Sequence, residues 1–327
     1  MDCSEKWIES EVTRRMKMEL LKEIIILFIG FVLLIKGADF FVDGASGIAS
    51  KFGIPQLVIG LTIVAFGTSA PEAAISISAA LKGSTGISIG NIIGSNIMNI
   101  LLILGITACI TPLAVAKSTV KVEIPFTILV SVVLVAYGTF FGKLNLIAGI
   151  LLWVLFILFF VHLIRISKEG KEEEEGEEQH SVLLLIVFIA AGLAGIVYGS
   201  NLTVDSASAI AKVFGVSDRV IGLTIVAFGT SLPELMTSVT AARKGKADIA
   251  IGNIVGSNIF NILFVLGTTA LITTVPYAKN FIFDGLVCIG AAVLLYAAVA
   301  RDGKMERKAG ITMLVCYAAY FVYLLAV

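Results

Sequence analysis

Charged side chains are scarce in this sequence. Asp, Glu, Lys and Arg make up 15% of the 327 residues, and hydrophobic residues make up 58%. Soluble domains average about 25% charged and about 45–50% apolar residues. The scarcity of charge, with a mean hydropathy of +1.00, therefore excludes an ordinary soluble domain and predicts an integral membrane protein. The formal net charge is zero, and no basic face suggests nucleic-acid binding.

Cysteine pairs and nucleotide-binding motifs are missing as well. Cys3, Cys109, Cys288 and Cys316 lie far apart with no Cys-x-x-Cys pair, so neither a disulfide framework nor a zinc site is expected. No G-x-x-x-x-G-K-[ST] loop appears, which argues against an ATP-driven pump. Residues 1–23 do not have the pattern of a signal peptide, and we interpret them as an amphipathic lead-in.

Long apolar runs are abundant. Ten stretches reach about 20 residues, the length that a helix needs to cross the hydrocarbon core of a membrane. We therefore predict an all-α integral membrane protein with ten transmembrane helices. The expected spans lie near residues 24–43, 54–81, 86–111, 121–140, 144–165, 182–204, 216–242, 248–273, 280–300 and 309–326.

One soluble stretch interrupts the apolar chain. The acidic run in RISKEGKEEEEGEEQH, residues 165–180, can neither enter hydrocarbon nor form a core. We interpret residues 166–181 as a solvated linker between a first unit of five helices, residues 24–165, and a second, residues 182–327. A regulatory ion-binding role for the acidic run is the alternative.

The two units are an internal repeat. Residues 60–105 align without gaps on residues 222–267, with 31 identities in 46 positions. Because five spans is an odd number, the second repeat starts on the opposite side of the membrane, and the two repeats are inverted. Inverted repeats are typical of secondary transporters, which bind their substrate at the repeat interface near the midplane.

The loops differ in basic charge between the two sides of the membrane. The side of the 166–181 linker carries thirteen Lys and Arg residues, whereas the other side carries five in its loops and five in the N-terminal extension. The positive-inside rule then predicts a cytoplasmic linker, with both termini outside. The expected location is the cell membrane, with multiple passes.

The sequence GTSAPE at residues 67–72 places a proline and a glutamate inside an expected span. Pro71 has no N–H and clashes with the preceding turn, so the helix must kink or unwind. Carbonyls from Ala65 to Thr68 then need partners, and a bound cation is one such partner. Glu72 adds a carboxylate, and Thr68 and Ser69 add hydroxyls. The second repeat reproduces this set at Ala227, Thr230, Ser231, Pro233 and Glu234.

A second motif occurs in both repeats, as GNIIGSNIMN at residues 90–99 and GNIVGSNIFN at residues 252–261. Ser95 and Asn99 are four residues apart and share a helix face, as do Ser257 and Asn261. The glycines of this motif allow close helix packing, which would bring these side chains against the glutamates. The other asparagines of the motif, and His162 outside it, are open to a purely structural interpretation.

All these candidate ligands offer oxygen, without histidine or thiol. Hard cations such as Ca²⁺ prefer such ligands, whereas zinc prefers nitrogen or sulfur. Two glutamates would balance the charge of one divalent ion or of two monovalent ions through almost the same atoms. Competition between such ions for one site is a physical basis for exchange. An intramembrane hydrolase would need an activated water or metal without an available His or Cys ligand. A non-transporting scaffold would not explain the duplication of these costly groups.

At these motifs the chain resembles the cation/calcium antiporter superfamily, and within it the prokaryotic sodium/calcium exchangers. The resemblance implies a calcium site with flanking sodium sites at the midplane, and a sliding motion of the first and sixth helices. By this resemblance, Glu72 and Glu234 would be shared calcium ligands. The other implied ion ligands are Ala65, Thr68, Ser69, Ser95, Asn99, Ala227, Thr230, Ser231, Ser257 and Asn261.

The coupling ion is expected to be Na⁺, with no cofactor and no obligate protein partner. Some family members, including potassium-dependent exchangers, carry aspartate at the position of Asn261, so asparagine here argues against potassium co-transport. Proton/calcium exchangers more often lack the GTS before the Pro-Glu pair. H⁺/Ca²⁺ exchange through the same glutamates nevertheless remains the alternative function.

Overall fold

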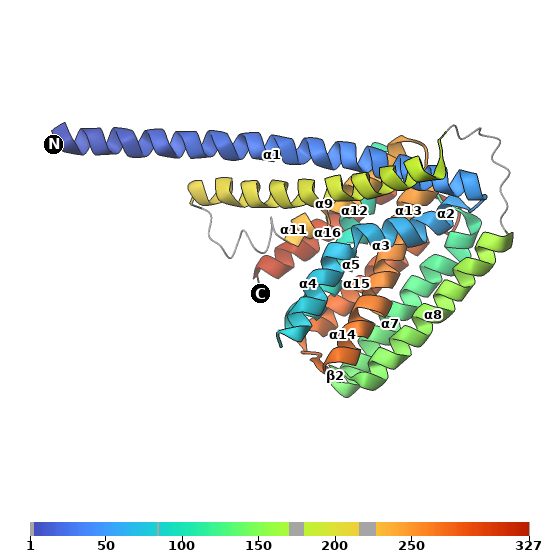
Figure 1. Ribbon diagram of the computed structural model, residues 1–327. Helices are drawn as coiled ribbons and strands as arrows, with labels where there is room; N and C mark the ends of the chain where they lie inside the picture. Colours follow the sequence, from blue (N-terminus) through green and yellow to red (C-terminus); the bar gives the residue numbers. More distant parts are fainter. Residues whose placement is uncertain (1–2, 84, 170–179, 216–226, 327) are drawn as a thin grey trace.

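The computed structural model describes residues 3–83, 85–169, 180–215 and 227–326, and these residues are almost entirely helical (Figure 1). The first half contains α1 (Cys3–Phe52), α2 (Gln56–Ile59), η1 (Gly60–Val64), α3 (Ala65–Thr68), α4 (Ala70–Leu81), α5 (Thr85–Met98), η2 (Asn99–Leu104), α6 (Gly105–Ile110), β1 (Leu113–Ala114), η3 (Thr119–Glu123), α7 (Ile124–Phe141), β2 (Lys143–Leu144) and α8 (Leu146–Glu169). Here η denotes a π-helical segment.

The second half follows the same order. It contains α9 (Val182–Val213), α11 (Ala227–Thr230), α12 (Leu232–Arg243), α13 (Ala247–Phe260), η5 (Asn261–Leu266), α14 (Gly267–Ile272), β3 (Val275–Pro276), α15 (Asn280–Val299), β4 (Lys304–Met305) and α16 (Arg307–Ala326). The central part of the acidic linker, residues 170–179, and the start of the expected span 216–242 lie outside the described residues.

The helices confirm an all-helical membrane protein. Within the described residues, seven helices are long and apolar enough to cross a membrane, or up to eight if the bent pair Gln56–Thr68 and Ala70–Leu81 is one span. The other two expected spans correspond to α11–α12, which follows residues outside the described part, and to α16, which opens with two basic residues. Helix α1 is continuous from Cys3, so no helix end marks the expected boundary at residue 23.

Two short antiparallel ribbons join the halves of the chain. Strand β1 pairs with β4, with Leu113 opposite Met305, and β2 pairs with β3, with Leu144 opposite Val275. The helical stretch Thr119–Phe141, 23 residues or about 34 Å long, separates β1 from β2. The two ribbons therefore lie at opposite ends of the helices.

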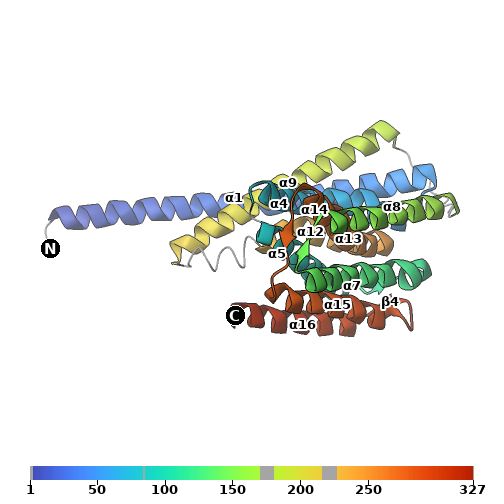
Figure 2. The same ribbon diagram turned by 90° about the horizontal axis from the view of Figure 1, so that it is seen from below.

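Helices α1 and α9 lie side by side and run at an angle across the remaining helices (Figure 1). Viewed from below, the two helices cross (Figure 2). Glycines make this contact possible, because a Cβ added at Gly37 would lie 2.7 Å from the backbone N of Ile196. A Cβ added at Gly192 would lie 2.5 Å from the backbone N of Phe41. The two backbones thus touch directly, as in other close contacts between membrane helices.

Candidate ion-binding site

Both expected helix breaks are present, and each places a glutamate at the start of a new helix. The axis bends by 51° between Gln56–Thr68 and Ala70–Leu81. Pro71 and Pro233 lie in the first turns of α4 and α12, where a missing N–H removes no helical hydrogen bond. Glu72 and Glu234 follow directly, and each is only 1% exposed.

The break is narrower than the sequence predicts. Only Ser69 leaves helical geometry between α3 and α4, with φ −83° and ψ 6°. The carbonyl of Ala65, expected to lose its partner, accepts the Ser69 N–H at 3.0 Å and the Ser257 hydroxyl at 3.4 Å. This carbonyl is therefore already engaged by protein groups.

Each glutamate is approached by hydroxyls from the opposite half of the chain. The Ser69 hydroxyl donates to Oε1 of Glu234 at 2.8 Å. Thr230 and Ser231 lie beside the Glu72 carboxylate, and Glu72 and Glu234 interact electrostatically. The two halves thus contribute to one site rather than to two separate sites.

Asn91 and Asn253 tie each broken helix to the long helix that follows it. The Asn253 amide donates to Ser238 Oγ at 2.9 Å and to the Glu234 carbonyl at 3.3 Å. In the first half, Asn91 donates to Ser76 Oγ at 3.0 Å. These hydrogen bonds agree with the structural interpretation of the two asparagines, in which they hold neighbouring helices together.

Four buried asparagines connect α5 and η2 with α13 and η5. Asn96 and Asn258 donate to each other's backbone carbonyls, at 3.1 Å in both directions. The side-chain oxygens of the same two residues accept from Asn261 at 3.1 Å and from Asn99 at 3.0 Å. Because their N–H groups are held in this way, Asn99 and Asn261 have fixed amide orientations.

Six side-chain oxygens of the candidate residues are buried and have no hydrogen-bond partner among the described residues. Five belong to carboxylates and amides: both carboxylate oxygens of Glu72, Oε2 of Glu234, Oδ1 of Asn99 and Oδ1 of Asn261. The sixth is the hydroxyl oxygen of Ser231. Leaving such groups unpaired is expensive, and a missing ligand is one explanation for their presence in a native structure. A set of carboxylate and amide oxygens suits a hard cation such as Ca²⁺.

The unpaired oxygens belong to helices that pack crosswise between the halves. Helix α4, which carries Glu72, contacts η5, which begins at Asn261. Helix α12, which carries Glu234, contacts η2, which begins at Asn99. The sequence predicts a contact between each glutamate and the asparagine of its own repeat, and the structure adds packing of each glutamate helix against the asparagine segment of the other half.

The remaining candidate ligands lie on the short helices before the two breaks, α3 and α11, and on the long helices α5 and α13. Thr68 is buried, and its hydroxyl is 2.9 Å from Oδ1 of Asn253. Ser95 and Ser257 are 5% and 0% exposed, in α5 and α13. Ala227 is the first described residue of α11, and Thr230 is the last residue of that helix.

Two acidic residues inside the apolar spans lie outside the repeated motifs. The Glu123 side chain is fully buried, 3.2 Å from Nε2 of His162, and Asp284 accepts a hydrogen bond from Tyr320 at 3.0 Å. The signal that could have found both is an ionisable residue within a membrane span. Near one end of α1, Asp43 pairs with Lys244 at 2.8 Å, a partner that the sequence does not predict.

Comparisons with known proteins agree with this geometry. A family model described as "Sodium/calcium exchanger protein" matches residues 22–165 and 184–326. The sodium/calcium exchanger MaX1 of Methanosarcina acetivorans is 34% identical, over 92% of this chain and 97% of that protein. The putative antiporter CaxA of Alkalimonas amylolytica is 41% identical, over 86% of this chain and 91% of that protein. A structure of the sodium-calcium exchanger NCX_Mj soaked with Na⁺ and Ca²⁺ matches with a TM-score of 0.80 at 37% identity, over 92% of this chain and 97% of that one.

Proposed function

Because the chain belongs to the sodium/calcium exchanger protein family, we propose that it exchanges Ca²⁺ for Na⁺ across the membrane, binding both ions between Glu72 and Glu234. The family is one of membrane antiporters rather than enzymes, and Ca²⁺ and Na⁺ are its substrates, not cofactors. The chain is a multi-pass membrane protein.

One observation carries the proposed site. Each half of the chain carries buried oxygens without a partner among the described residues at the same two positions, a glutamate and an asparagine. A carboxylate deep in a membrane protein marks an ion pathway by default. We infer that Glu72 and Glu234 bind Ca²⁺, and that neighbouring hydroxyl, amide and backbone oxygens complete the calcium and sodium sites.

The charge of the site explains how the ions would compete. Two carboxylates balance one Ca²⁺ or two Na⁺, so replacing one by the other keeps the buried site neutral. A third Na⁺ would add a net positive charge and make the exchange electrogenic. Neutral oxygens such as that of Ser69, which lies 2.8 Å from Glu234 Oε1, would complete sodium cages beside the carboxylates.

Alternating access would follow from ten helices arranged as two inverted repeats of five, residues 24–165 and 182–327. Two observations support this symmetry. The π-helical segments that begin at Asn99 and Asn261 have the offset of 162 residues that relates the two repeated motifs. The two strand ribbons lie at opposite ends of the helices. The direct backbone contact between α1 and α9 favours motion of these two helices as one unit. We infer that they slide across the remaining helices and expose the site to each side in turn.

The orientation that we propose has the linker, residues 166–181, in the cytoplasm and both termini outside. Thirteen Lys and Arg residues on the linker side support it.

The alternative in ion coupling is H⁺/Ca²⁺ exchange, in which the same glutamates would be protonated. The neutral hydroxyls around the carboxylates favour Na⁺, because a proton needs only a titratable group.

Uptake of radioactive calcium into proteoliposomes tests the proposal. We expect uptake when the vesicles are loaded with Na⁺ and diluted into Na⁺-free buffer, and none when Na⁺ is equal on both sides. Under a pH gradient without a Na⁺ gradient, uptake should stay at the background level. Uptake that follows only the pH gradient would establish the proton exchanger instead.

A further inference from the structure

A basic cavity of about 480 Å³ lies beside the β1–β4 ribbon. It is lined by Pro112, Leu113, Ala114, Lys304, Glu306, Arg307 and Lys308. The lining has three cations and one carboxylate, a net charge of two positive units. None of the three cationic side chains forms an ion pair with a described residue. We call this cavity the basic pocket.

The second ribbon provides an internal comparison. Gly142-Lys143-Leu144 before α8 corresponds to Gly303-Lys304-Met305 before α16, and both glycines have φ near +60°. The next residues then place Leu146 and Ile147 where the second repeat has Arg307 and Lys308. Leu146 and Ile147 are 57% and 66% exposed. At these two positions the first copy of the junction is thus apolar, and the second copy carries two additional cations.

The start of α16 suits a phosphate group. Arg307 is the first residue of this helix, so the free N–H groups and the positive end of the helix dipole add to the side-chain charges. Arginine and lysine both form charge-assisted hydrogen bonds with phosphate oxygens. The positive-inside rule explains basic residues on this face in general, but it does not explain three of them around one cavity.

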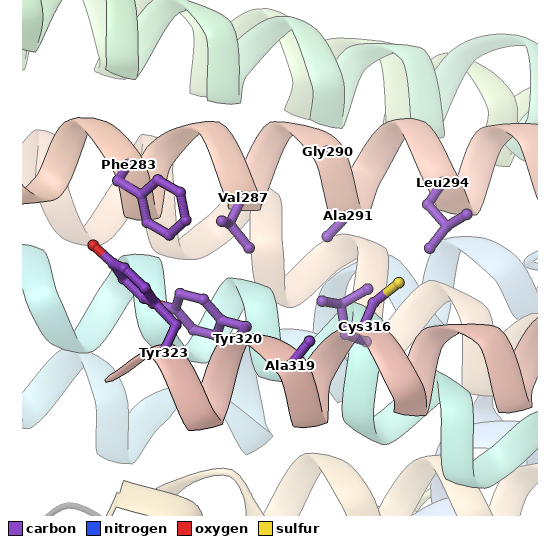
Figure 3. Close-up of a pocket in the computed structure, with 10 residues that line it drawn as sticks. Phe283, Val287, Gly290, Ala291, Leu294, Cys316, Ala319, Tyr320 and Tyr323 are labelled. Atoms are coloured by element: carbon purple, nitrogen blue, oxygen red, sulfur yellow. The ribbon is translucent and has the colours of Figure 1, made fainter. Parts of the chain in front are cut away.

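An apolar groove of about 400 Å³ lies farther along the same helix, between α15 and α16. Figure 3 shows Phe283, Val287, Ala291 and Leu294 of α15 opposite Cys316, Ala319, Tyr320 and Tyr323 of α16. A Cβ added at Gly290, which also lines this groove, would meet no atom within 4 Å. The groove therefore has room for an apolar chain.

The basic pocket and the groove are related by the geometry of α16. Lys308 and Ala319 are eleven residues apart, about three turns, so they lie on nearly the same face of the helix. Along α16 the groove extends from Cys316 to Tyr323, about 12 to 23 Å from Lys308. Half of the hydrocarbon core is about 15 Å thick. A phosphate at the pocket would therefore place the distal part of an extended acyl chain in the groove, whereas the apolar groove offers a free anion no hydrogen-bond donor.

We propose that α16 binds an anionic phospholipid, with its phosphate in the basic pocket and one acyl chain in the groove between α15 and α16. The proposal concerns a site separate from Glu72 and Glu234. It therefore stands whichever ion drives transport.

Native mass spectrometry tests it on the full chain, released from nanodiscs with equal amounts of phosphatidylglycerol and phosphatidylcholine. We expect preferential retention of phosphatidylglycerol. Arg307→Gln with Lys308→Gln should lower this retention about fivefold for each lost cation, roughly 25-fold for the pair. The matched control is Lys117→Gln with Arg301→Gln, which removes two exposed cations from the same face outside the pocket.

A second variant tests the groove without changing charge. Gly290→Leu should fill the groove and lower phosphatidylglycerol retention, whereas Gly86→Leu, at a glycine where an added Cβ also meets nothing within 4 Å, should not. Equal losses in both charge variants would mean diffuse surface attraction and would overturn the proposal. Saturable binding of inorganic phosphate in phosphatidylcholine nanodiscs, with no effect of Gly290→Leu on lipid retention, would identify a soluble anion instead and would overturn it too.

Discussion

From the hydrogen bond between Ser69 and Glu234 we predict that Ser69→Ala changes the ion selectivity. The two side chains are 0% and 1% exposed, and their oxygens are 2.8 Å apart. A hydrogen bond to a charged group contributes about 1.5–3 kcal/mol, which corresponds to a factor of about 10 to 150 in an equilibrium constant. Ser69→Ala removes this oxygen and leaves Glu234 with two unpaired oxygens, as Glu72 already has.

The loss should affect Na⁺ more than Ca²⁺. Calcium carries two charges that both carboxylates balance, so one neutral oxygen is a small part of its binding energy. Sodium carries half the charge and depends more on neutral oxygens. We expect Ser69→Ala to raise the half-saturating Na⁺ concentration by about tenfold or more, and to change the half-saturating Ca²⁺ concentration by a smaller factor.

Calcium flux in proteoliposomes, titrated separately with Na⁺ and Ca²⁺, measures both constants. Ser78→Ala is the matched control, because Ser78 is an exposed residue of α4, the helix that begins directly after Ser69. Equal shifts for the two ions in Ser69→Ala would refute the selectivity argument. An unchanged Na⁺ dependence would show that Ser69 is not a sodium ligand.

Three further outcomes are expected. Glu72→Gln and Glu234→Gln should each abolish calcium exchange while the purified protein stays folded, because each removes half of the balancing charge; near wild-type uptake by either variant would exclude that glutamate as a ligand. Gly192→Ala should impair transport or folding, since the new methyl group would lie 2.5 Å from a backbone nitrogen of α1, and normal flux and thermal stability would show that the helices do not need this contact. Deletion of residues 172–178 should leave uptake by correctly inserted protein intact, because an acidic run of this composition is typical of a solvated linker; lost uptake would make the linker part of the mechanism.

The sequence predicts the two helix breaks well, because the repeat and its prolines are local features. The break before Pro71 and Pro233 appears where the missing N–H requires it. The π-helical segments start at Asn99 and Asn261, the matching positions of the two motifs, although nothing in the residues themselves predicts the π geometry.

Contacts between the repeats are what the sequence could not predict. Periodicity tells which face of a helix is polar, but it does not tell which helix of the other half lies against that face. The bond from Ser69 to Glu234 and the reciprocal bonds between Asn96 and Asn258 are contacts of this kind. The motifs do not reveal Glu123 for another reason, because it belongs to neither of them and its partner His162 lies on a different helix.

We propose that several Na⁺ ions drive calcium movement through one shared site. The most direct measurement is calcium flux against Na⁺ concentration at fixed pH, with the membrane potential clamped. Several sodium ions acting on one equilibrium predict a cooperative dependence, with a Hill coefficient above about 1. A flux that ignores Na⁺ and follows only the pH gradient would contradict the claim.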